Sequence, residues 1–259
     1  MAYRRGIITN SKLGLPTNTG LNLIFSQHTA RLVAILFDEG LLTEIRTAAC
    51  GALAAQYFAP KQVSSIGVIG SGVQARWQLR MLASVTPCRD VNLFALERLE
   101  EFKTEMEKEG WKVTICDNAE TVVKKVNLLL TVTTTRKPII KAEWLKGRRN
   151  LHISAIGADS EGKGELEPEV VQMADFLCCD ALAQTFERGE FQHALKRGLI
   201  KESQVHEIGN VIEKPELHRQ GITDDRFTIF DTSGVAVQDI MITKYIYDAL
   251  QKSTPKCRL

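Results

Sequence analysis

Short apolar runs alternate with segments of helical periodicity through the middle of the chain. Six runs from residue 65 onward predict strands: Ile66–Ile69, Val91–Ala95, Trp111–Ile115, Asn127–Val132, Leu151–Ile156 and Asp175–Cys179. Between them, Glu97–Glu109 predicts a charged helix, and 117–125 predicts a second helix with Asp117 or Asn118 as its cap. Strands separated by helices in this way are typical of an α/β fold with a parallel, doubly wound sheet.

The first sixty residues follow a different pattern, in which short apolar runs are separated by turn residues. Leu21–Phe25 and Leu32–Phe37 predict two strands of a small β-rich domain. The alanine-rich run Arg46–Phe58 predicts a helix, with Thr43 as its N-cap and Pro60 at its end.

The last part of the chain is predicted to return to this smaller domain. Phe227–Phe230 predicts a strand, and Val235–Leu250 predicts a helix. The apolar residues of that helix are Val237, Ile240, Met241, Tyr245 and Leu250. We expect the helix to cross back to the N-terminal β segment, which makes the smaller domain discontinuous. The predicted domains are therefore residues 1–60 with 233–259, and residues 61–232.

A glycine-rich turn follows the first strand of the predicted sheet. The spacing is G-x-G-x-x-A, with Gly70, Gly72 and Ala75 at the three small positions and a helix beginning directly afterwards. Gly70 permits the tight turn, Gly72 lets the backbone approach a pyrophosphate, and Ala75 lets the helix pack on the strand. The strand, turn and helix start together favour a dinucleotide site over a bare glycine turn.

Three segments are expected to meet at one edge of the sheet. The turn at Gly70, the threonines 133–135 and the stretch Gly157–Asp159 each follow a predicted strand. In an open parallel sheet, ligands bind outside the carboxyl ends of the strands. The sequence therefore predicts one crevice lined by these three segments.

Composition narrows the class of protein. Of the 259 residues, 44% are hydrophobic and 25% are charged, as in ordinary globular proteins. The net charge of +2 favours neither nucleic acid nor an acidic membrane as a partner, and no apolar run approaches the roughly 20 residues of a membrane span. The cysteines form no C-x-x-C pair and the histidines have no ligand spacing, so no metal site is predicted. The adjacent Cys178 and Cys179 are interpreted as buried thiols.

Arg46 has an unexpected position, at the start of the predicted helix where the helix dipole is positive. An arginine placed there often has an anionic partner. A surface salt bridge is the alternative interpretation.

Five motifs occur in order along the chain: GLPTNTG, LLTEIRTAACGALAAQYFAP, GVIGSGVQA, GADSEGKGEL and FDTSGVAVQD. With them the chain resembles the ornithine cyclodeaminase/mu-crystallin family from about Gly14 to Leu250. The resemblance implies a Rossmann domain that binds NAD or NADP. It also implies a β-rich domain that forms a homodimer and helps bind a small amino-acid or imino-acid substrate. Activities in the family include ornithine cyclodeamination, alanine dehydrogenation and cyclic ketimine reduction, while some members only bind ligands.

The resemblance also implies roles for single residues. Arg46 matches the arginine that holds the substrate carboxylate, a task suited to the planar guanidinium. Asp159 matches the proposed general base and Lys163 the lysine of the same loop, although spacing alone also fits Asp159 as a turn residue. The matches on the cofactor side are Gly70, Gly72, Val73 and Gln74 at the pyrophosphate, Thr133 and Thr134 beside the cofactor, and Ser233 and Gly234 near the nicotinamide.

Two features depart from the family pattern. Family members have a longer segment before the start of this chain, which supplies strands and two basic residues to the substrate site. The smaller domain is therefore expected to be N-terminally shortened, and neither Arg4 nor Arg5 can be assigned the missing role. Ala95 stands where NAD-preferring relatives have an acidic residue. Glu97 could reach a ribose and Arg98 a 2′-phosphate, so the sequence leaves the choice between NAD and NADP open.

The leading functional hypothesis is an ornithine cyclodeaminase that converts L-ornithine to L-proline and ammonia, because Asp159 and Lys163 occur together. The alternatives are a ketimine reductase or alanine-type dehydrogenase, and a non-catalytic binding protein of mu-crystallin type. The N-terminus lacks a signal-peptide pattern, so a cytoplasmic location is expected. The final Cys257-Arg258-Leu259 resembles the S-K-L peroxisomal address, with a frayed tail as the alternative.

Overall fold

The computed structural model describes residues 19–219 and 225–253. Most of the GLPTNTG motif, both N-terminal arginines and the C-terminal tripeptide lie outside these ranges. The chain divides into two compact units, Met1–Arg46 with Ala236–Leu259, and Thr47–Val235. The first crossing between the units lies inside helix α2 (Leu41–Phe58), whereas the sequence prediction placed it after residue 60.

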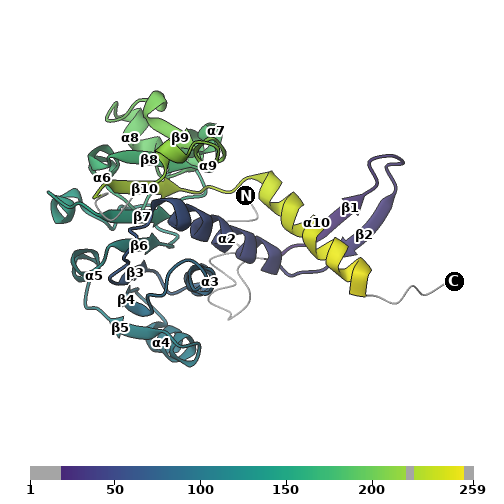
Figure 1. Ribbon diagram of the computed structural model, residues 1–259, viewed down its shortest axis with the longest axis horizontal. Helices are drawn as coiled ribbons and strands as arrows, with labels where there is room; N and C mark the ends of the chain where they lie inside the picture. Colours follow the sequence, from purple (N-terminus) through teal and green to yellow (C-terminus); the bar gives the residue numbers. More distant parts are fainter. Residues whose placement is uncertain (1–18, 220–224, 254–259) are drawn as a thin grey trace. The chain divides into compact units, whose positions relative to one another are not determined.

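The larger unit is built on one eight-stranded sheet with helices on both of its faces (Figure 1). In spatial order the strands are β5 (Lys112–Ile115), β4 (Asp90–Phe94), β3 (Ile66–Ile69), β6 (Leu128–Thr131), β7 (Leu151–Ala155), β10 (Phe227–Asp231), β8 (Phe176–Cys179) and β9 (Val205–Glu207). Every neighbouring pair in the sheet is parallel, so the predicted doubly wound α/β fold is confirmed.

The order of the chain reverses beside β3. The chain runs outward from β3 to β4 and β5, and then returns to β6 on the other side of β3. A crevice opens outside the carboxyl ends of the strands at such a reversal, and ligands bind there. Gly70 directly follows β3 and Val132 follows β6, so the glycine turn and the threonine segment flank this point.

Successive side chains of a strand point to opposite faces of the sheet, which explains why helices cover both faces. In β6, Leu128 and Leu130 join a core with helices α3 (Val73–Leu82) and α4 (Leu99–Lys108). Leu129 points the other way, into a core that includes helix α5 (Ala119–Lys125). Side chains of a strand alternate between its two faces, so a strand apolar at every position is buried on both.

Helix α5 begins at one of the two caps predicted for it. Asn118 is the N-cap residue, and its side-chain oxygen accepts a hydrogen bond from the Thr121 backbone N–H at 2.8 Å. The sequence analysis did not predict the short elements between β7 and β10. They are strand β9, η1 (Ala142–Leu145), α6 (Pro168–Met173), α7 (Leu182–Arg188), α8 (Gln192–Lys196), η2 (Glu202–Gln204), α9 (Ile208–Ile212) and η3 (Pro215–Leu217).

The smaller unit contains the antiparallel hairpin of β1 (Asn22–Phe25) and β2 (Leu32–Leu36), together with helix α10 (Ala236–Ser253). The Thr243 hydroxyl of α10 donates a hydrogen bond to the Asn22 side-chain oxygen of β1 at 2.9 Å. This bond joins the last helix to the first strand, far away in the sequence.

Helix α2 begins earlier than the sequence indicated. Its first residue is Leu41, so Thr43 lies inside the helix and its prediction as N-cap is wrong. Asp38 caps the helix instead, because its Oδ2 accepts a hydrogen bond from the Leu42 backbone N–H at 3.0 Å. Arg46 consequently lies in the second turn of α2, where the positive end of the helix dipole acts on it less strongly.

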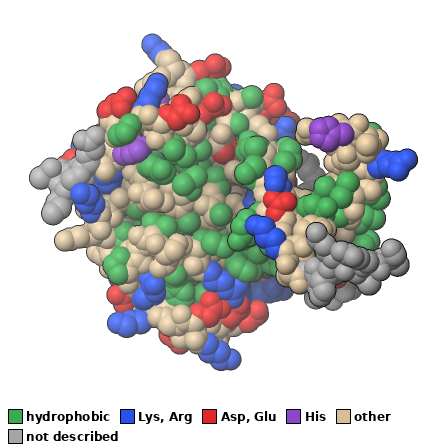
Figure 2. Space-filling view, turned by 45° about the vertical axis from the view of Figure 1, so that its right-hand side comes forward, with side chains coloured by type: hydrophobic (Ala, Val, Ile, Leu, Met, Phe, Trp, Pro, Cys, Tyr) green, Lys and Arg blue, Asp and Glu red, His purple; other side chains and the backbone are tan. Residues whose placement is uncertain are grey.

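Large apolar side chains cover much of the surface of the smaller unit (Figure 2). The exposed ones are Leu21, Leu23, Phe25, Leu32, Val33, Ile35 and Phe37 around the hairpin, and Val237, Ile240, Met241, Tyr245 and Leu250 on α10. We call these residues the apolar surface of the smaller unit. Contiguous apolar area of this kind marks interaction sites more often than free surface.

Candidate functional site

The backbone at Gly70 has a conformation that strongly favours glycine. Its φ of +114° lies outside the range that other residues adopt readily, and its N–H donates to the Phe94 carbonyl oxygen at 2.8 Å. A Cβ atom at this position would stand 3.0 Å from the carbonyl oxygen of Val132 and 3.2 Å from Thr133 Cγ2. The glycine turn and the threonine segment are therefore in direct contact, as the sequence analysis expected.

The N-terminus of α3 is open. Gly72 is its N-cap, no side chain caps the helix, and a Cβ at Gly72 would meet nothing within 4 Å. Val73 is exposed and Gln74 is half-buried in the first turn that follows. The first N–H groups of a helix lack partners within the helix, and an anion can supply them. The residues present therefore fit the pyrophosphate of a dinucleotide.

Arg76 supports this turn, although the sequence analysis assigned it no role. Its side chain is largely buried and donates to the carbonyl oxygens of Ser71 and Gly72. The same guanidinium forms ion pairs with Glu101 at 3.2 Å and Glu105 at 2.6 Å on α4. Arg76 thus ties the carbonyl side of the turn to the next helix, while its N–H side stays open.

The loop after β4 reaches the same turn. The Ser71 hydroxyl donates to the backbone oxygen of Glu97 at 2.6 Å. Arg98 has φ of +54° as the N-cap of α4, and both the Glu97 and Arg98 side chains are exposed. Both side chains are open to solvent, where Glu97 could accept from a ribose hydroxyl and Arg98 could donate to a 2′-phosphate, so the structure leaves the choice between NAD and NADP open.

Asp159 and Lys163 form an ion pair on the loop that follows β7. Lys163 Nζ lies 2.6 Å from Asp159 Oδ1 and 3.4 Å from the Gly157 carbonyl oxygen. The Lys163 side chain is 15% exposed and that of Asp159 is 54% exposed. The lysine thus holds one carboxylate oxygen while much of the carboxylate stays open to solvent, an arrangement suited to accepting a proton from a bound molecule.

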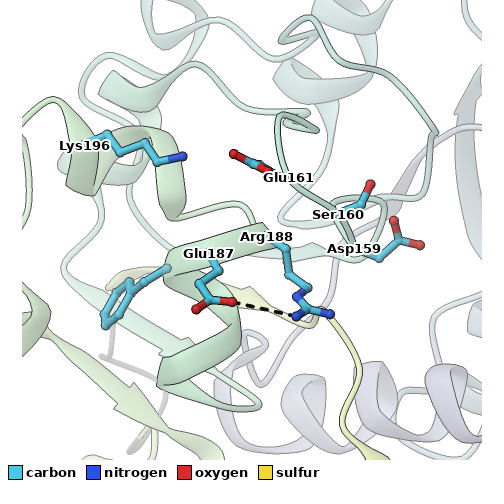
Figure 3. A pocket seen from close by; sticks show the side chains of 7 residues that line it. Asp159, Ser160, Glu161, Glu187, Arg188 and Lys196 are labelled. Carbon is cyan, nitrogen blue, oxygen red and sulfur yellow. Dashed lines mark ion pairs between the residues drawn. The ribbon is translucent and has the colours of Figure 1, made fainter. Parts of the chain in front are cut away.

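A cavity of about 470 Å³ adjoins this loop. Its wall includes Asp159, Ser160 and Glu161 on one segment, and Glu187 and Arg188 of α7 and Lys196 of α8 on another. Figure 3 shows Asp159 and Lys196 on opposite sides, with the Glu187–Arg188 ion pair between them. The volume suits a small molecule, and the charged groups of both signs suit a zwitterion.

Asp180 at the end of β8 holds the turn that contains Ser233 and Gly234. Its Oδ2 accepts hydrogen bonds from the Thr232 hydroxyl at 2.8 Å and the Gly234 N–H at 2.7 Å. The Ser233 hydroxyl lies 3.5 Å from Oδ1. The family resemblance implies that this turn lies near a nicotinamide, whereas Asp180 was not predicted, because its only signal in the sequence is its position after a strand.

Arg46 belongs to the smaller unit. Its Nε forms an ion pair with Asp239 Oδ1 at 3.0 Å, and its Nη1 donates to the Gln238 side-chain oxygen at 3.0 Å. The salt bridge given above as the alternative interpretation of Arg46 is thus present. Binding of a substrate carboxylate by Arg46 stays a prediction.

The adjacent thiols are confirmed as buried. Cys178 and Cys179 have no exposed surface, and burial raises the pKa of both thiols. Since the thiolate is the reactive form, neither is a candidate nucleophile. Within the described residues, no group of three or more His, Cys, Asp and Glu side chains could hold a metal ion.

Comparison with known proteins gives a consistent result. A family model described as the Ornithine cyclodeaminase/mu-crystallin family matches residues 3–254. An uncharacterized cyclodeaminase of Sinorhizobium fredii is 34% identical over 254 residues, which are 95% of this chain and 75% of that protein.

None of the helices in the described residues is long and apolar enough to cross a membrane.

Solved structures that are similar over nearly the whole chain include two with a bound nicotinamide nucleotide. An archaeal alanine dehydrogenase dimer with bound NAD has a TM-score of 0.84 and 34% identity, covering 95% of this chain and 76% of that one. A Thermococcus litoralis Δ1-pyrroline-2-carboxylate reductase in complex with NADH and L-proline has a TM-score of 0.86 and 26% identity, with coverage of 95% and 76%.

Proposed function

The chain belongs to the ornithine cyclodeaminase/mu-crystallin family, and on this premise we propose that it is an NAD(P)-dependent enzyme acting on a small amino or imino acid. The observation that carries the proposal is the Asp159–Lys163 pair beside a cavity, on a loop after β7. The uncapped helix start at Gly72 follows β3 of the same parallel sheet, so both features lie at carboxyl ends of its strands. The NAD bound to the archaeal relative supports the choice of cofactor.

The cofactor would lie across the reversal in strand order. When bound, its nicotinamide accepts or donates the hydride, which no side chain can do. Gly70 and Gly72 would receive the pyrophosphate, and Thr133 and Thr134 would lie beside the nucleotide. The turn at Ser233 and Gly234, fixed by Asp180, would stand near the nicotinamide.

Three side chains would act on the substrate. Asp159 would take a proton from the substrate amine as the α-carbon becomes an imine carbon. Lys163 would keep the Asp159 carboxylate in place through their ion pair. Arg46 would exchange Asp239 for the substrate carboxylate, to which its guanidinium can donate two parallel hydrogen bonds.

We favour ornithine cyclodeamination as the specific reaction. L-Ornithine would lose its α-amino group as ammonia and close to L-proline, and the hydride that leaves the α-carbon would return to the ring, so the cofactor is regenerated. The second candidate is reduction of an imino acid or oxidation of an amino acid. It is supported by the similarity to an alanine dehydrogenase and to a pyrroline-carboxylate reductase. A binding protein without catalysis is the third candidate.

A panel of assays separates these candidates. The purified protein is incubated with L-ornithine and NAD⁺, and proline and ammonia are measured. In parallel, oxidation of NADH and NADPH is followed with pyruvate plus ammonia and with Δ1-pyrroline-2-carboxylate. Proline formation supports the first candidate, and nucleotide oxidation supports the second. Nucleotide binding without turnover of any substrate supports the third, and absence of nucleotide binding contradicts the proposal as a whole.

A further inference from the structure

Glu165 is a fully buried carboxyl group that joins two of the loops at the candidate site. It is the last acidic residue of GADSEGKGEL, to which the sequence analysis assigned no role. Its Oε1 accepts hydrogen bonds from the Thr133 backbone N–H at 2.6 Å and the Thr133 hydroxyl at 2.7 Å. Its Oε2 accepts one from the Gly157 N–H at 2.9 Å. One side chain therefore connects the loop after β6 to the loop after β7.

Close packing at Gly157 makes this connection rigid. A Cβ atom on Gly157 would stand 2.1 Å from the Thr133 carbonyl oxygen and 2.6 Å from the carboxyl carbon of Glu165. No side chain fits in that space, so the two loops contact each other through their backbones. A shift of Thr133 must therefore displace Gly157 as well.

The connection continues from Gly157 to the candidate base. The Gly157 carbonyl oxygen accepts from Lys163 Nζ, which also holds Asp159. At the far side of the loop, Gln192 of α8 donates to the Lys163 carbonyl oxygen at 3.2 Å and accepts from the Gly162 N–H at 3.0 Å. The loop is thus fixed at both ends, and Asp159 projects from the fixed part.

A second buried carboxyl group holds Glu165 itself. Glu190 accepts hydrogen bonds from the backbone N–H of Glu165 at 3.0 Å and from that of Leu166 at 2.7 Å. Burial raises the pKa of Glu165, and burial together with the nearby Glu165 raises the pKa of Glu190. Placing two carboxyl groups in the interior is costly, and each of them accepts from backbone N–H groups of these loops rather than from a cationic partner. The arrangement is therefore better explained by a need to fix the loops than by stability.

We infer that Glu165 is a positioning residue that transmits the placement of the cofactor at Thr133 to the loop carrying Asp159. The inference rests on the proposed function, since Thr133 and Asp159 have their roles there. Nucleotide bound against the threonine segment fixes Thr133, Glu165 passes this restraint to Gly157, and Lys163 and Asp159 are held in turn. Small displacements of a positioned group cost about 10²-fold in rate.

The test compares Glu165→Gln with Glu167→Gln. In Glu165→Gln an amide NH₂ must face either the Thr133 or the Gly157 N–H, so one loop is released while the volume is kept. Glu167→Gln is the matched control, because Glu167 also accepts from a backbone N–H, that of Ala142 at 2.8 Å, away from the site. Hydrogen exchange of the 157–163 amides is measured with and without NADH, together with NADH affinity, kcat and KM.

In the wild type and in Glu167→Gln, NADH should slow exchange of the 157–163 amides. Glu165→Gln should still bind NADH but lose this protection, and its kcat should fall by about 10²-fold while KM changes little. A purely structural role would instead lower the melting temperature and leave the protection by NADH in place. If Glu165→Gln does not fold, Glu165→Asp decides by the same measurements, because its shorter side chain cannot span both loops.

The outcomes separate this inference from the proposed function. Wild-type protein that binds NADH and turns over a substrate, but shows no NADH-dependent protection of the loop, overturns the inference and leaves the function standing. A folded Glu165→Gln protein with wild-type protection and kcat overturns it too. Wild-type protein that binds no nicotinamide nucleotide overturns the proposed function, and the inference with it.

Discussion

At Gly72 the chain presents backbone to open space, in contrast to the crowded surroundings of Gly70. Replacing Gly72 with valine should leave the fold intact, since a Cβ there meets no neighbour within 4 Å. The added side chain should occupy the place of the pyrophosphate and abolish nucleotide binding. Calorimetry with NADH and NADPH measures the effect. Gly209→Val, in a helix position equally open, is the control, and a Gly72→Val protein with unchanged affinity would show that the turn is not the site.

Asp159 has a carboxylate that a conservative substitution can test directly. Asparagine keeps the shape and one acceptor oxygen but cannot take a proton, so Asp159→Asn should lower kcat by about 10²–10⁴-fold with unchanged nucleotide affinity. Glu143→Gln, which changes an exposed carboxyl group of η1 that does not line the cavity, should have little effect. Wild-type turnover by Asp159→Asn would leave Asp159 as a turn residue only.

Arg46→Lys should instead raise KM more than it lowers kcat, since lysine loses the bidentate geometry.

Sequence reasoning at this scale found residues with a local signature and missed those with distant partners. The G-x-G-x-x-A spacing of Gly70 and Gly72 predicts the turn, and in the structure Gly70 contacts the threonine segment. Arg76, Asp180 and Glu165 are as important to the geometry, but each acts on groups tens of residues away in the chain. Nothing in the neighbouring sequence shows which arginine or carboxylate will be buried. Such residues become visible only when the strands are placed in order.

At the scale of elements, the contact between β7 and β10 should depend on pH. His152 of β7 is fully buried, with Nδ1 2.8 Å from the Thr228 hydroxyl of β10 and Nε2 3.1 Å from the Ser154 hydroxyl. Burial, with a smaller contribution from the charge of Arg219, lowers its pKa from 6.5 to about 3. At any pH between these two values, the His152 ring is therefore protonated in the unfolded chain and neutral in the folded chain.

The free energy of unfolding should consequently fall as the pH drops below about 6.5, by up to about 1.4 kcal/mol per pH unit, until both states are protonated near pH 3. Buried carboxyl groups titrate in the opposite sense, because burial raises the pKa of Asp231 to about 8. Urea unfolding of the wild type and of His152→Gln between pH 7 and 4 isolates the histidine. Identical slopes for the two proteins would contradict the assignment of a neutral buried ring.

The elements with strong periodicity were predicted and the short ones were not. Seven of the eight parallel strands and α3 to α5 follow from apolar runs and charged segments long enough to show a period, whereas the three-residue strand β9 was not predicted. Helices α8 and α9 have five residues each, little more than one turn, which is too short for a periodic signal. The start of α2 was misplaced because the threonine looked like a cap, whereas Asp38 before the glycine turn supplied the hydrogen bond.

At the scale of the molecule, the apolar surface of the smaller unit predicts association. Its exposed side chains include Phe25 and Phe37 near the hairpin and Ile240 and Tyr245 on α10. Burying such area between two copies of the chain would stabilise a dimer, the form in which the archaeal relative is described. We expect the wild type to sediment as a dimer or larger species.

A charged residue within this surface should shift the distribution towards the monomer, so Ile240→Glu is compared with the wild type by analytical ultracentrifugation. Ile212→Glu, a similar change at a partly exposed position of the larger unit, is the control and should sediment like the wild type. A wild-type protein that stays monomeric and highly soluble at every concentration would contradict the prediction.

The absence of room at Gly157 limits how this site can diverge. Any residue other than glycine there must push the threonine segment away, so the backbone frame of the two loops can change only in concert. The side chains of Glu161 and of Arg188 on the facing helix are exposed on the cavity wall and can be exchanged one at a time. Descendants of such a chain can therefore acquire new substrates by small steps while the frame that holds the cofactor is inherited unchanged.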